Sequence, residues 1–280
     1  MFTIILVVLV FLSVFSPVFA PHNPFDLEAL DLMNSHMPPA WLEESDPRFL
    51  LGTDEQGRDI LSAILYGARI SMEVGVASVI LAMSIGVALG LISGYFGGRT
   101  DNLIMRIAEV QLAFPAILLA LLINGIFKIA LPEETFATLA IPVLILAIGL
   151  TGWVQYARTV RGMAMVERRK EYIQAARLVG TSSSRILLRH ILPNVMGPVM
   201  VIATIHLAVA IITEATLSFL GVGTPLTEPS LGALVRAGQD FLFSGQWWQV
   251  IFPGTALVLI VLSVNLLGDW LRDYFNPKLR

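Results

Sequence analysis

Few side chains are spaced in a way that supports enzyme or metal chemistry. A phosphate-binding loop needs Gly-Lys-Ser or Gly-Lys-Thr after a glycine-rich turn, but Lys128, Lys170 and Lys278 follow Phe, Arg and Pro. The histidines show none of the spacings typical of metal ligands, and they are His22, His36, His190 and His206. We therefore expect no enzyme activity, no ATP hydrolysis by this chain and no resident metal or other cofactor.

Three polar side chains lie within or beside long apolar runs: Gln111, Asn124 and Glu214. Polar and ionisable groups are costly at such positions in a membrane and usually face the bundle interior or a water-filled cavity. These side chains are therefore candidates for lining a water-filled pathway through the bundle. For Glu214, a structural hydrogen bond is an equally supported alternative.

The basic stretch from Glu171 to Asn194 combines helix formers with turn residues. Gly180 suits the left-handed position that ends a helix, and a serine among residues 182–184 can begin a second helix. Pro193 is expected to end that second helix. The pattern predicts two short helices that project from the membrane and dock a protein, with an amphipathic membrane-surface helix as the alternative.

Long apolar segments must position these side chains. The chain has 280 residues, 56% hydrophobic and 14% charged, whereas ordinary soluble domains have about 45–50% and about 25%. A helix that crosses the bilayer core needs about 20 mainly apolar residues. Six segments qualify: Phe2 to Ala20, Met72 to Phe96, Val110 to Phe127, Thr138 to Tyr156, Met196 to Leu220 and Ile251 to Leu271.

The fold class is therefore an all-α polytopic membrane protein with six transmembrane helices. Residues 1–70 are expected to form a first helix and an external loop, and residues 71–280 a core of five helices with the basic loop 158–194. A cleaved signal peptide is the alternative for the first segment. No positive residue precedes its apolar run and Pro21 would follow the cut, so a spanning helix is favoured.

Span two carries small residues at every fourth position: Ser78, Ala82, Gly86, Gly90 and Gly94. This spacing places them on one face of a helix, where a second helix approaches closely. We expect internal packing rather than a subunit interface.

Lysine and arginine are concentrated in the loops on one side of the predicted spans, chiefly between Arg158 and Arg189. An excess of these residues marks the cytoplasmic side. Both termini and the basic loop are therefore expected in the cytoplasm, in a multi-pass protein of a bacterial or archaeal inner membrane. The acidic segment 21–70 faces outward as a solvated surface or a docking site.

The basic stretch also resembles the Glu-Ala-Ala signature of ABC-importer permeases. The positions that match are Ala175, Ala176, Gly180, Leu192 and Pro193. Gln174 replaces the namesake Glu, and His190 stands where Ile is usual.

Further motifs resemble the dipeptide, oligopeptide and nickel permease family, specifically its second, C-type subunit. They are Leu51-Gly52-Thr53-Asp54-Glu55-Gln56-Gly57-Arg58-Asp59, Gly94-Tyr95-Phe96-Gly97-Gly98, Leu217-Ser218-Phe219-Leu220-Gly221-Val222-Gly223 and Asn265-Leu266-Leu267-Gly268-Asp269. Near the C-terminus, Asn276-Pro277 replaces the usual Asp-Pro.

This resemblance implies a type I importer permease fold with cytoplasmic coupling helices, and a role as half of a translocation pathway for peptides. The implied ATPase-coupling residues are Gln174, Ala175, Ala176, Gly180, Leu192 and Pro193. The implied partners are a second homologous permease, two ABC ATPase subunits that bind ATP and Mg, an external substrate-binding protein and the lipid bilayer. No nucleic acid is expected.

Two alternatives remain open. The same role in a nickel or other small-solute importer fits the family equally well. An ATP-independent secondary transporter fits less well, because such proteins place paired ionisable groups at the midplane or have broken helices in inverted repeats, and neither is evident in the sequence.

Overall fold

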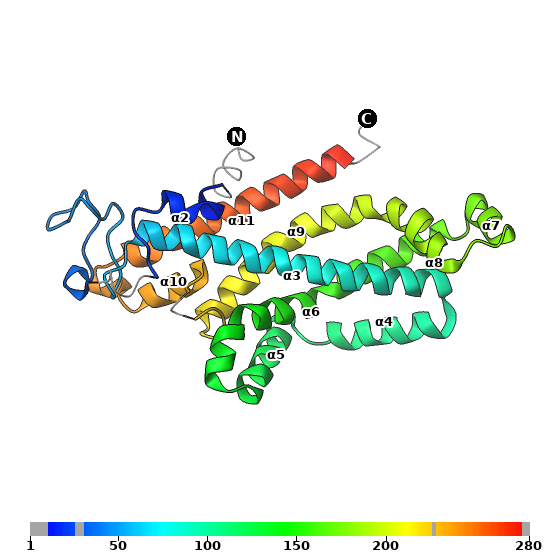
Figure 1. Cartoon of the computed structure of the whole chain (residues 1–280), viewed down its shortest axis with the longest axis horizontal. Helices are drawn as coiled ribbons and strands as arrows, with labels where there is room; N and C mark the ends of the chain where they lie inside the picture. The colour runs from blue at the N-terminus through cyan, green and yellow to red at the C-terminus, as the bar shows by residue number, and fades with distance from the viewer. Residues whose placement is uncertain (1–10, 26–30, 226–227, 276–280) are drawn as a thin grey trace.

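The computed structural model describes residues 11–25, 31–225 and 228–275. In these ranges all regular secondary-structure elements are helices (Figure 1). The α-helices are α2 (Ser16–Phe19), α3 (Ile60–Phe96), α4 (Gly98–Leu112), α5 (Ala116–Ala130), α6 (Glu133–Glu167), α7 (Glu171–Leu178), α8 (Ser183–Ile186), α9 (Leu192–Phe219), α10 (Leu231–Gln239) and α11 (Trp248–Phe275).

Four helical stretches in the described residues are long and apolar enough to cross a membrane. They are α3, α6, the continuous stretch Ser183–Phe219 and Trp248–Asp273 of α11. The pair α4 and α5 passes the same test as one bent unit, which gives up to five candidate spans. The first predicted span, Phe2 to Ala20, lies partly outside the described residues, so the count of six stays a prediction.

The third predicted span, Val110 to Phe127, is wrong as a single helix. The chain turns by 93° between α4 and α5. Pro115 has no N–H to donate and disfavours helical geometry at the residue before it. It takes an extended ψ of 130° and becomes the N-cap of α5, so the apolar run contains a helix break.

The small-residue stripe of α3 packs inside the chain, as predicted, because α6 lies directly against it. A Cβ added at Gly90 would lie 2.6 Å from the carbonyl oxygen of Ala157, and one at Gly94 would lie 2.6 Å from that of Arg161. Only glycine permits this approach between the two backbones. The longest helices of the bundle are therefore held together by direct backbone contact.

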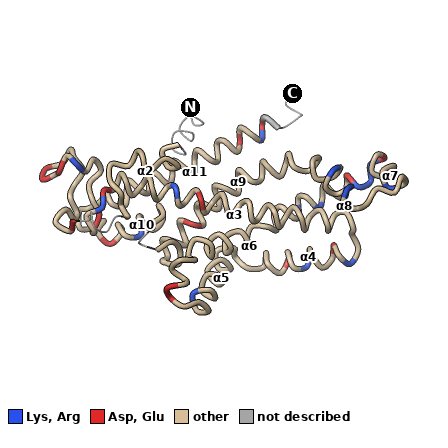
Figure 2. Tube along the Cα trace, viewed as in Figure 1, with Lys and Arg blue, Asp and Glu red and all other residues tan. Residues whose placement is uncertain are grey.

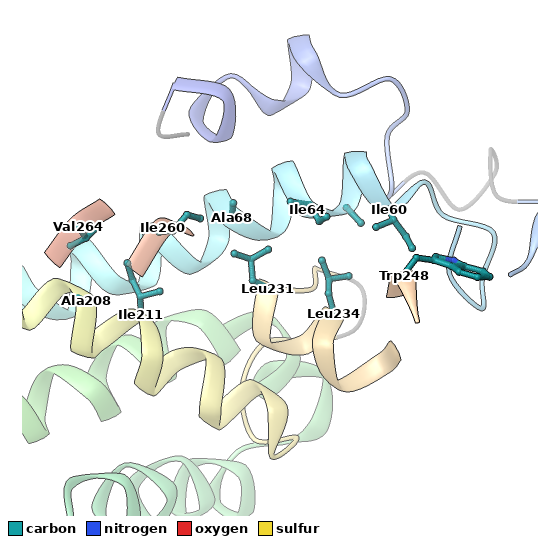
Figure 3. Close-up of a cluster of buried hydrophobic side chains, with 11 residues drawn as sticks. Ile60, Ile64, Ala68, Ala208, Ile211, Leu231, Leu234, Trp248, Ile260 and Val264 are labelled. Carbon is teal, nitrogen blue, oxygen red and sulfur yellow. The ribbon is translucent and has the colours of Figure 1, made fainter. Parts of the chain in front are cut away.

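Helix α3 begins at Ile60, well before the expected start of the span at Met72. The Asp59 carboxylate caps it by accepting from the Ser62 backbone N–H at 2.9 Å. This extra length reaches a cluster of buried hydrophobic side chains formed with α9, α10 and α11 (Figure 3). Ile60, Ile64, Leu231, Leu234 and Trp248 belong to this cluster.

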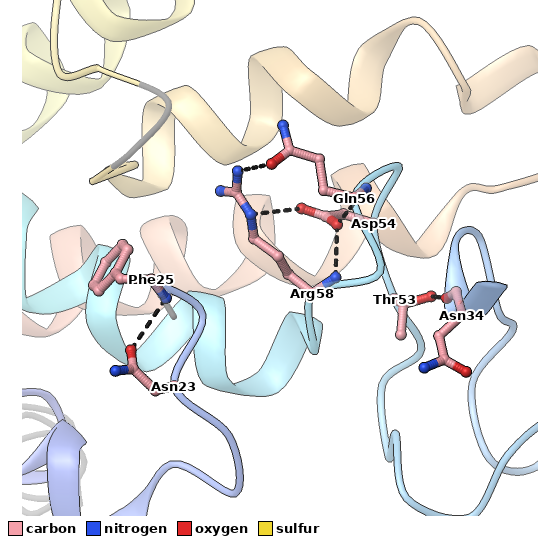
Figure 4. A network of polar contacts seen from close by, with 7 residues as sticks. All are labelled: Asn23, Phe25, Asn34, Thr53, Asp54, Gln56 and Arg58. Atoms are coloured by element: carbon pink, nitrogen blue, oxygen red, sulfur yellow. Dashed lines mark hydrogen bonds and ion pairs between the residues drawn. The ribbon is translucent and has the colours of Figure 1, made fainter. Parts of the chain in front are cut away.

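The segment before α3 folds onto the same end of the bundle. The Trp248 indole N–H donates to the carbonyl oxygen of Thr53 at 3.2 Å, and Gln249 Nε2 lies 2.8 Å from His36 Nδ1. Asp54 accepts from the backbone N–H of Arg58 at 2.9 Å in the tight turn before α3 (Figure 4). These contacts fix the segment at the end opposite α7 and α8 (Figure 1).

Candidate functional site

Helix α7 ends at a built turn around Gly180. The Gly180 N–H donates to the Arg177 carbonyl at 3.0 Å, and the Thr181 N–H donates to the Ala176 carbonyl at 3.0 Å. This pair of bonds is the Schellman motif, which requires a left-handed residue at its centre. Gly180 has φ of 80°, so the glycine stands where the sequence predicts the turn.

Polar contacts at the base of α7 tie it to α6 and α9. The Tyr172 hydroxyl donates to the Glu167 carboxylate, and Asn194 Nδ2 donates to Tyr172 at 3.0 Å. Burial and the neighbouring Glu167 raise the pKa of Tyr172 to about 12, so this phenol stays protonated and keeps donating. The next residue, Ile173, is fully buried and packs in one cluster with Ile186 of α8. The base of α7 is therefore rigidly braced.

The outer face of α7 is mostly exposed, and its contacts within the chain include the Gln174 amide, which donates to the Arg169 carbonyl at 2.9 Å. Gln174 and Ala175 are exposed, and the tip carries Leu178 and Val179 with 89% and 81% of their surfaces exposed. Sequence reasoning missed these two side chains, although two apolar residues directly before Gly180 in a charged loop were a usable signal. Together with the motif residues they form a projecting surface with an apolar centre, which we call the α7 knob (Gln174, Ala175, Ala176, Leu178, Val179 and Gly180).

The second short helix does not end at Pro193, contrary to the prediction. Helix α8 continues through a π-helical segment, Leu187–Ile191, into α9. Proline removes one backbone donor from a helix, and Pro193 directly follows the π-helical segment, where the hydrogen-bond pattern changes. Leu192 packs against the cluster around Ile173, so this stretch joins the α7 knob directly to a membrane-spanning helix.

Basic residues surround this end of the molecule. Figure 2 shows lysine and arginine around α7 and α8, whereas the segments before α3 carry several acidic side chains at the opposite end. Arg177 stacks over the Tyr95 ring at 4.8 Å, and Arg168 donates to the Tyr95 carbonyl at 2.8 Å. The same arginines that mark the loop as basic also attach it to the end of α3.

Glu214 lies in a closed cage of hydroxyl groups near the other end of α9. Its side chain is fully buried, and it accepts from Ser71 of α3 at 2.7 Å and from Ser218 at 2.6 Å. Ser71 in turn accepts from the Leu231 N–H at the start of α10. Of the two alternatives for Glu214, these contacts favour the structural one, because the carboxylate joins three helices.

Gln111 also makes contacts within the chain. Its amide nitrogen donates to the carbonyl oxygens of Leu150 and Thr151, each at 3.0 Å, and its oxygen accepts from the Trp153 indole at 2.7 Å. The side chain therefore pins the last turn of α4 to α6, next to the break that precedes α5.

Asn124 has a different environment. It lies in α5 and is fully buried, and neither its amide nitrogen nor its oxygen has a hydrogen-bond partner. An unpaired buried amide costs about 1–3 kcal/mol. Gln111, Asn124 and Glu214 thus come from three helices, and among the described residues no hydrogen bond joins one of them to another.

No cluster of three or more His, Cys, Asp or Glu side chains in the described ranges has metal-binding geometry. The arrangement instead defines a class: a multi-spanning membrane protein with a braced helical projection on one side. Residues 86–280 match the family described as binding-protein-dependent transport system inner membrane component. The chain belongs to this family, and it is therefore a non-catalytic permease of an ABC transport system, with no cofactor expected on it.

Curated relatives match over nearly the whole chain. The di/tripeptide transport system permease protein DppC of Pseudomonas aeruginosa is 37% identical over 98% of this chain and 86% of its own length. The oligopeptide transport system permease protein OppC of Bacillus subtilis is 38% identical, covering 99% of this chain and 84% of its own length. Both similarities extend over nearly all of this chain.

Solved structures share the fold. A chain of the inward-facing MetNI methionine ABC transporter superposes with a TM-score of 0.58 at 17% identity, covering 76% of this chain and 96% of its own length. A chain of an amino acid ABC transporter solved with histidines gives 0.55 at 15% identity, with 75% and 92% covered. The helical arrangement is therefore that of ABC-importer permeases.

Proposed function

We propose that this chain forms half of the translocation pathway of a peptide importer, the other half coming from a second, homologous permease. The observation that carries the proposal is the end-to-end similarity to permeases named for di/tripeptide and oligopeptide transport. Two ABC ATPases supply the energy, and an external binding protein delivers the solute.

The α7 knob is the proposed docking element for one ATPase. Its exposed Leu178 and Val179 offer an apolar anchor of the kind that dominates binding energy at protein interfaces. Its base contacts α6 and continues into α9, so a displacement of the knob reaches the membrane-spanning helices directly. This geometry supports assigning Gln174, Ala175, Ala176, Gly180, Leu192 and Pro193 to ATPase coupling.

In the proposed topology the chain spans the inner membrane six times, with both termini and the α7 knob in the cytoplasm. Helix α10 and the segment that precedes α3 then face the outside, where the binding protein docks. Asn124 contributes to the pathway in this proposal, since its buried amide has no hydrogen-bond partner within the chain. Gln111 and Glu214 hold the surrounding helices in register.

The experiment that tests the proposal compares cargoes in the living cell. Cells with and without this chain are supplied with a labelled dipeptide, a labelled tetrapeptide or radioactive nickel. We expect loss of the chain to abolish high-affinity peptide uptake and to leave nickel uptake unchanged. Loss of nickel uptake alone would establish the small-solute alternative in place of peptides.

A further inference from the structure

A polar cleft of about 610 Å³ lies between α4 and α6, towards the α7 end of the molecule. The residues that line it are Asp101, Asn102, Met105, Arg106, Glu109, Arg158 and Arg161. Three guanidinium groups face two carboxylates, so the cleft carries a net charge of about +1 at neutral pH. Neither the coupling element nor the pathway residues described above use this cleft.

Two of the arginines are already paired. Arg161 donates to Asp101 from Nε at 2.5 Å and from Nη2 at 2.6 Å, and Ser93 donates to the same carboxylate. Arg106 lies 3.7 Å from Glu109, but 80% and 56% of these side chains are exposed, and exposed pairs of this kind contribute little. Arg158 is exposed, and no carboxylate of the described residues forms an ion pair with it.

The amphipathic pattern of α4 indicates which side of the cleft meets water. Ile104 and Ala108 are buried against Trp153 of α6. A second face is apolar and more than half exposed, formed by Leu103, Ile107 and Val110. Charged groups avoid hydrocarbon and face the bundle interior or a wet cavity. The apolar face therefore suits lipid, and the charged flank suits water.

The facing surface of α6 agrees with this assignment. Arg158 follows Tyr156, the last residue of the apolar run, by two positions, which is about 3 Å along a helix. The exposed residues on either side of Arg158, one turn away, are Gln155 and Gly162, and neither is apolar enough to favour lipid. The cleft therefore opens at the end of the apolar run of α6 that lies towards α7.

We propose that this cleft is a water-filled anion site at the inner end of the translocation pathway, and that Arg158 binds the carboxylate of the transported solute as it exits. The inference rests on the proposed function for the identity of the solute. A guanidinium group binds a carboxylate through two parallel hydrogen bonds. Arg161, one helical turn away, is neutralised by its ion pair with Asp101, so Arg158 supplies the net positive charge of the cleft.

The chain has no cysteine, so a single introduced thiol reports the cleft cleanly. Asn102→Cys places the thiol on the exposed lining, and Ile107→Cys on the apolar face of α4 is the matched control. The assembled importer is treated from the α7 side with an anionic or a cationic methanethiosulfonate reagent, and labelling is read on this chain. We expect Asn102→Cys to react and Ile107→Cys to remain unlabelled.

The anionic reagent should react faster with Asn102→Cys than the cationic one. The labelling rate with the anionic reagent should fall roughly fivefold when Arg158→Gln is added, since one unit charge a few ångströms away contributes about 1 kcal/mol in water. Millimolar tripeptide with a free carboxylate should slow the labelling, whereas the C-terminally amidated tripeptide should not. Equal rates for the two reagents would overturn the anion site.

Two further outcomes would also overturn the proposal. Protection that depends on acidic phospholipid in the surrounding nanodisc, and not on peptide, would assign the cleft to a lipid phosphate. Labelling of the isolated chain but not of the assembled importer would make the cleft a subunit interface. The preference of Asn102→Cys for the anionic reagent is measured without transport. If peptide uptake is normal but this preference is absent, only the anion site is contradicted. If peptide uptake itself is absent, the proposed function is contradicted.

Discussion

Among single residues, Glu214 best separates what the sequence predicts from what only the fold shows. An ionisable group in an apolar run was identifiable from the sequence, because such a group must be satisfied by partners or water. Its partner Ser71, however, lies 143 residues away along the chain, and no local pattern indicates that pairing. The unpaired amide of Asn124 and the bracing of Tyr172 by Asn194 depend on long-range packing in the same way.

We expect Glu214→Gln to reduce solute uptake while leaving the amount of chain in the membrane unchanged. Ser71 and Ser218 donate to different oxygens of the carboxylate. The amide replaces one of these oxygens with an NH2 donor, so one hydroxyl loses its acceptor and the spacing of α3 and α9 should shift. Ser84→Ala is the control, because the Ser84 hydroxyl bonds only to Ile80 of its own helix. Wild-type uptake by Glu214→Gln would show that the cage does not limit transport.

For the helices, the sequence predicted which segments are helical better than it predicted the residues at which each helix begins and ends. The small-residue stripe on α3 and the turn at Gly180 were both identified, because each depends on a local steric requirement. The sequence predicted one span across Pro115, where the structure has a 93° turn, and a helix end at Pro193, where the helix continues. Proline either begins a helix or interrupts one, and the local sequence does not decide which occurs.

Gly90→Ala should destabilise the bundle, since its added methyl group meets the backbone of α6. Overpacking of this kind costs about 1–3 kcal/mol. Gly254→Ala in α11 is the matched control, because a Cβ there meets nothing within 4 Å. The measurement is thermal unfolding of the purified chain in detergent, and equal midpoints for the two variants would contradict the close α3–α6 contact.

Gly180→Val should uncouple ATP hydrolysis from transport without disturbing the membrane-spanning helices. A Cβ at Gly180 meets nothing within 4 Å, so the change acts through its φ of 80°, which costs a β-branched residue about 1 kcal/mol or more. Gly180→Asn, which tolerates this conformation, should retain most activity. Both variants are compared for substrate-stimulated ATPase activity and ATPase pull-down, and wild-type behaviour of Gly180→Val would remove the α7 knob from the coupling mechanism.

For the whole molecule, the distribution of charge predicts the orientation. Basic residues gather around α7 and α8, and an excess of lysine and arginine marks the cytoplasmic side. A reporter fused after Lys128 should therefore read as external, and one fused after Glu167 as cytoplasmic. An external reading at Glu167 would reverse the proposed topology.

The central claim is that this chain transports peptide only as one permease of an ATP-driven complex. The most direct measurement is uptake of a labelled dipeptide into liposomes that contain this chain, the second permease and both ATPases, with the binding protein outside. We predict ATP-dependent uptake that disappears when either permease or the ATPases are omitted. Dipeptide accumulation by this chain alone, driven by an ion gradient without ATP, would contradict it.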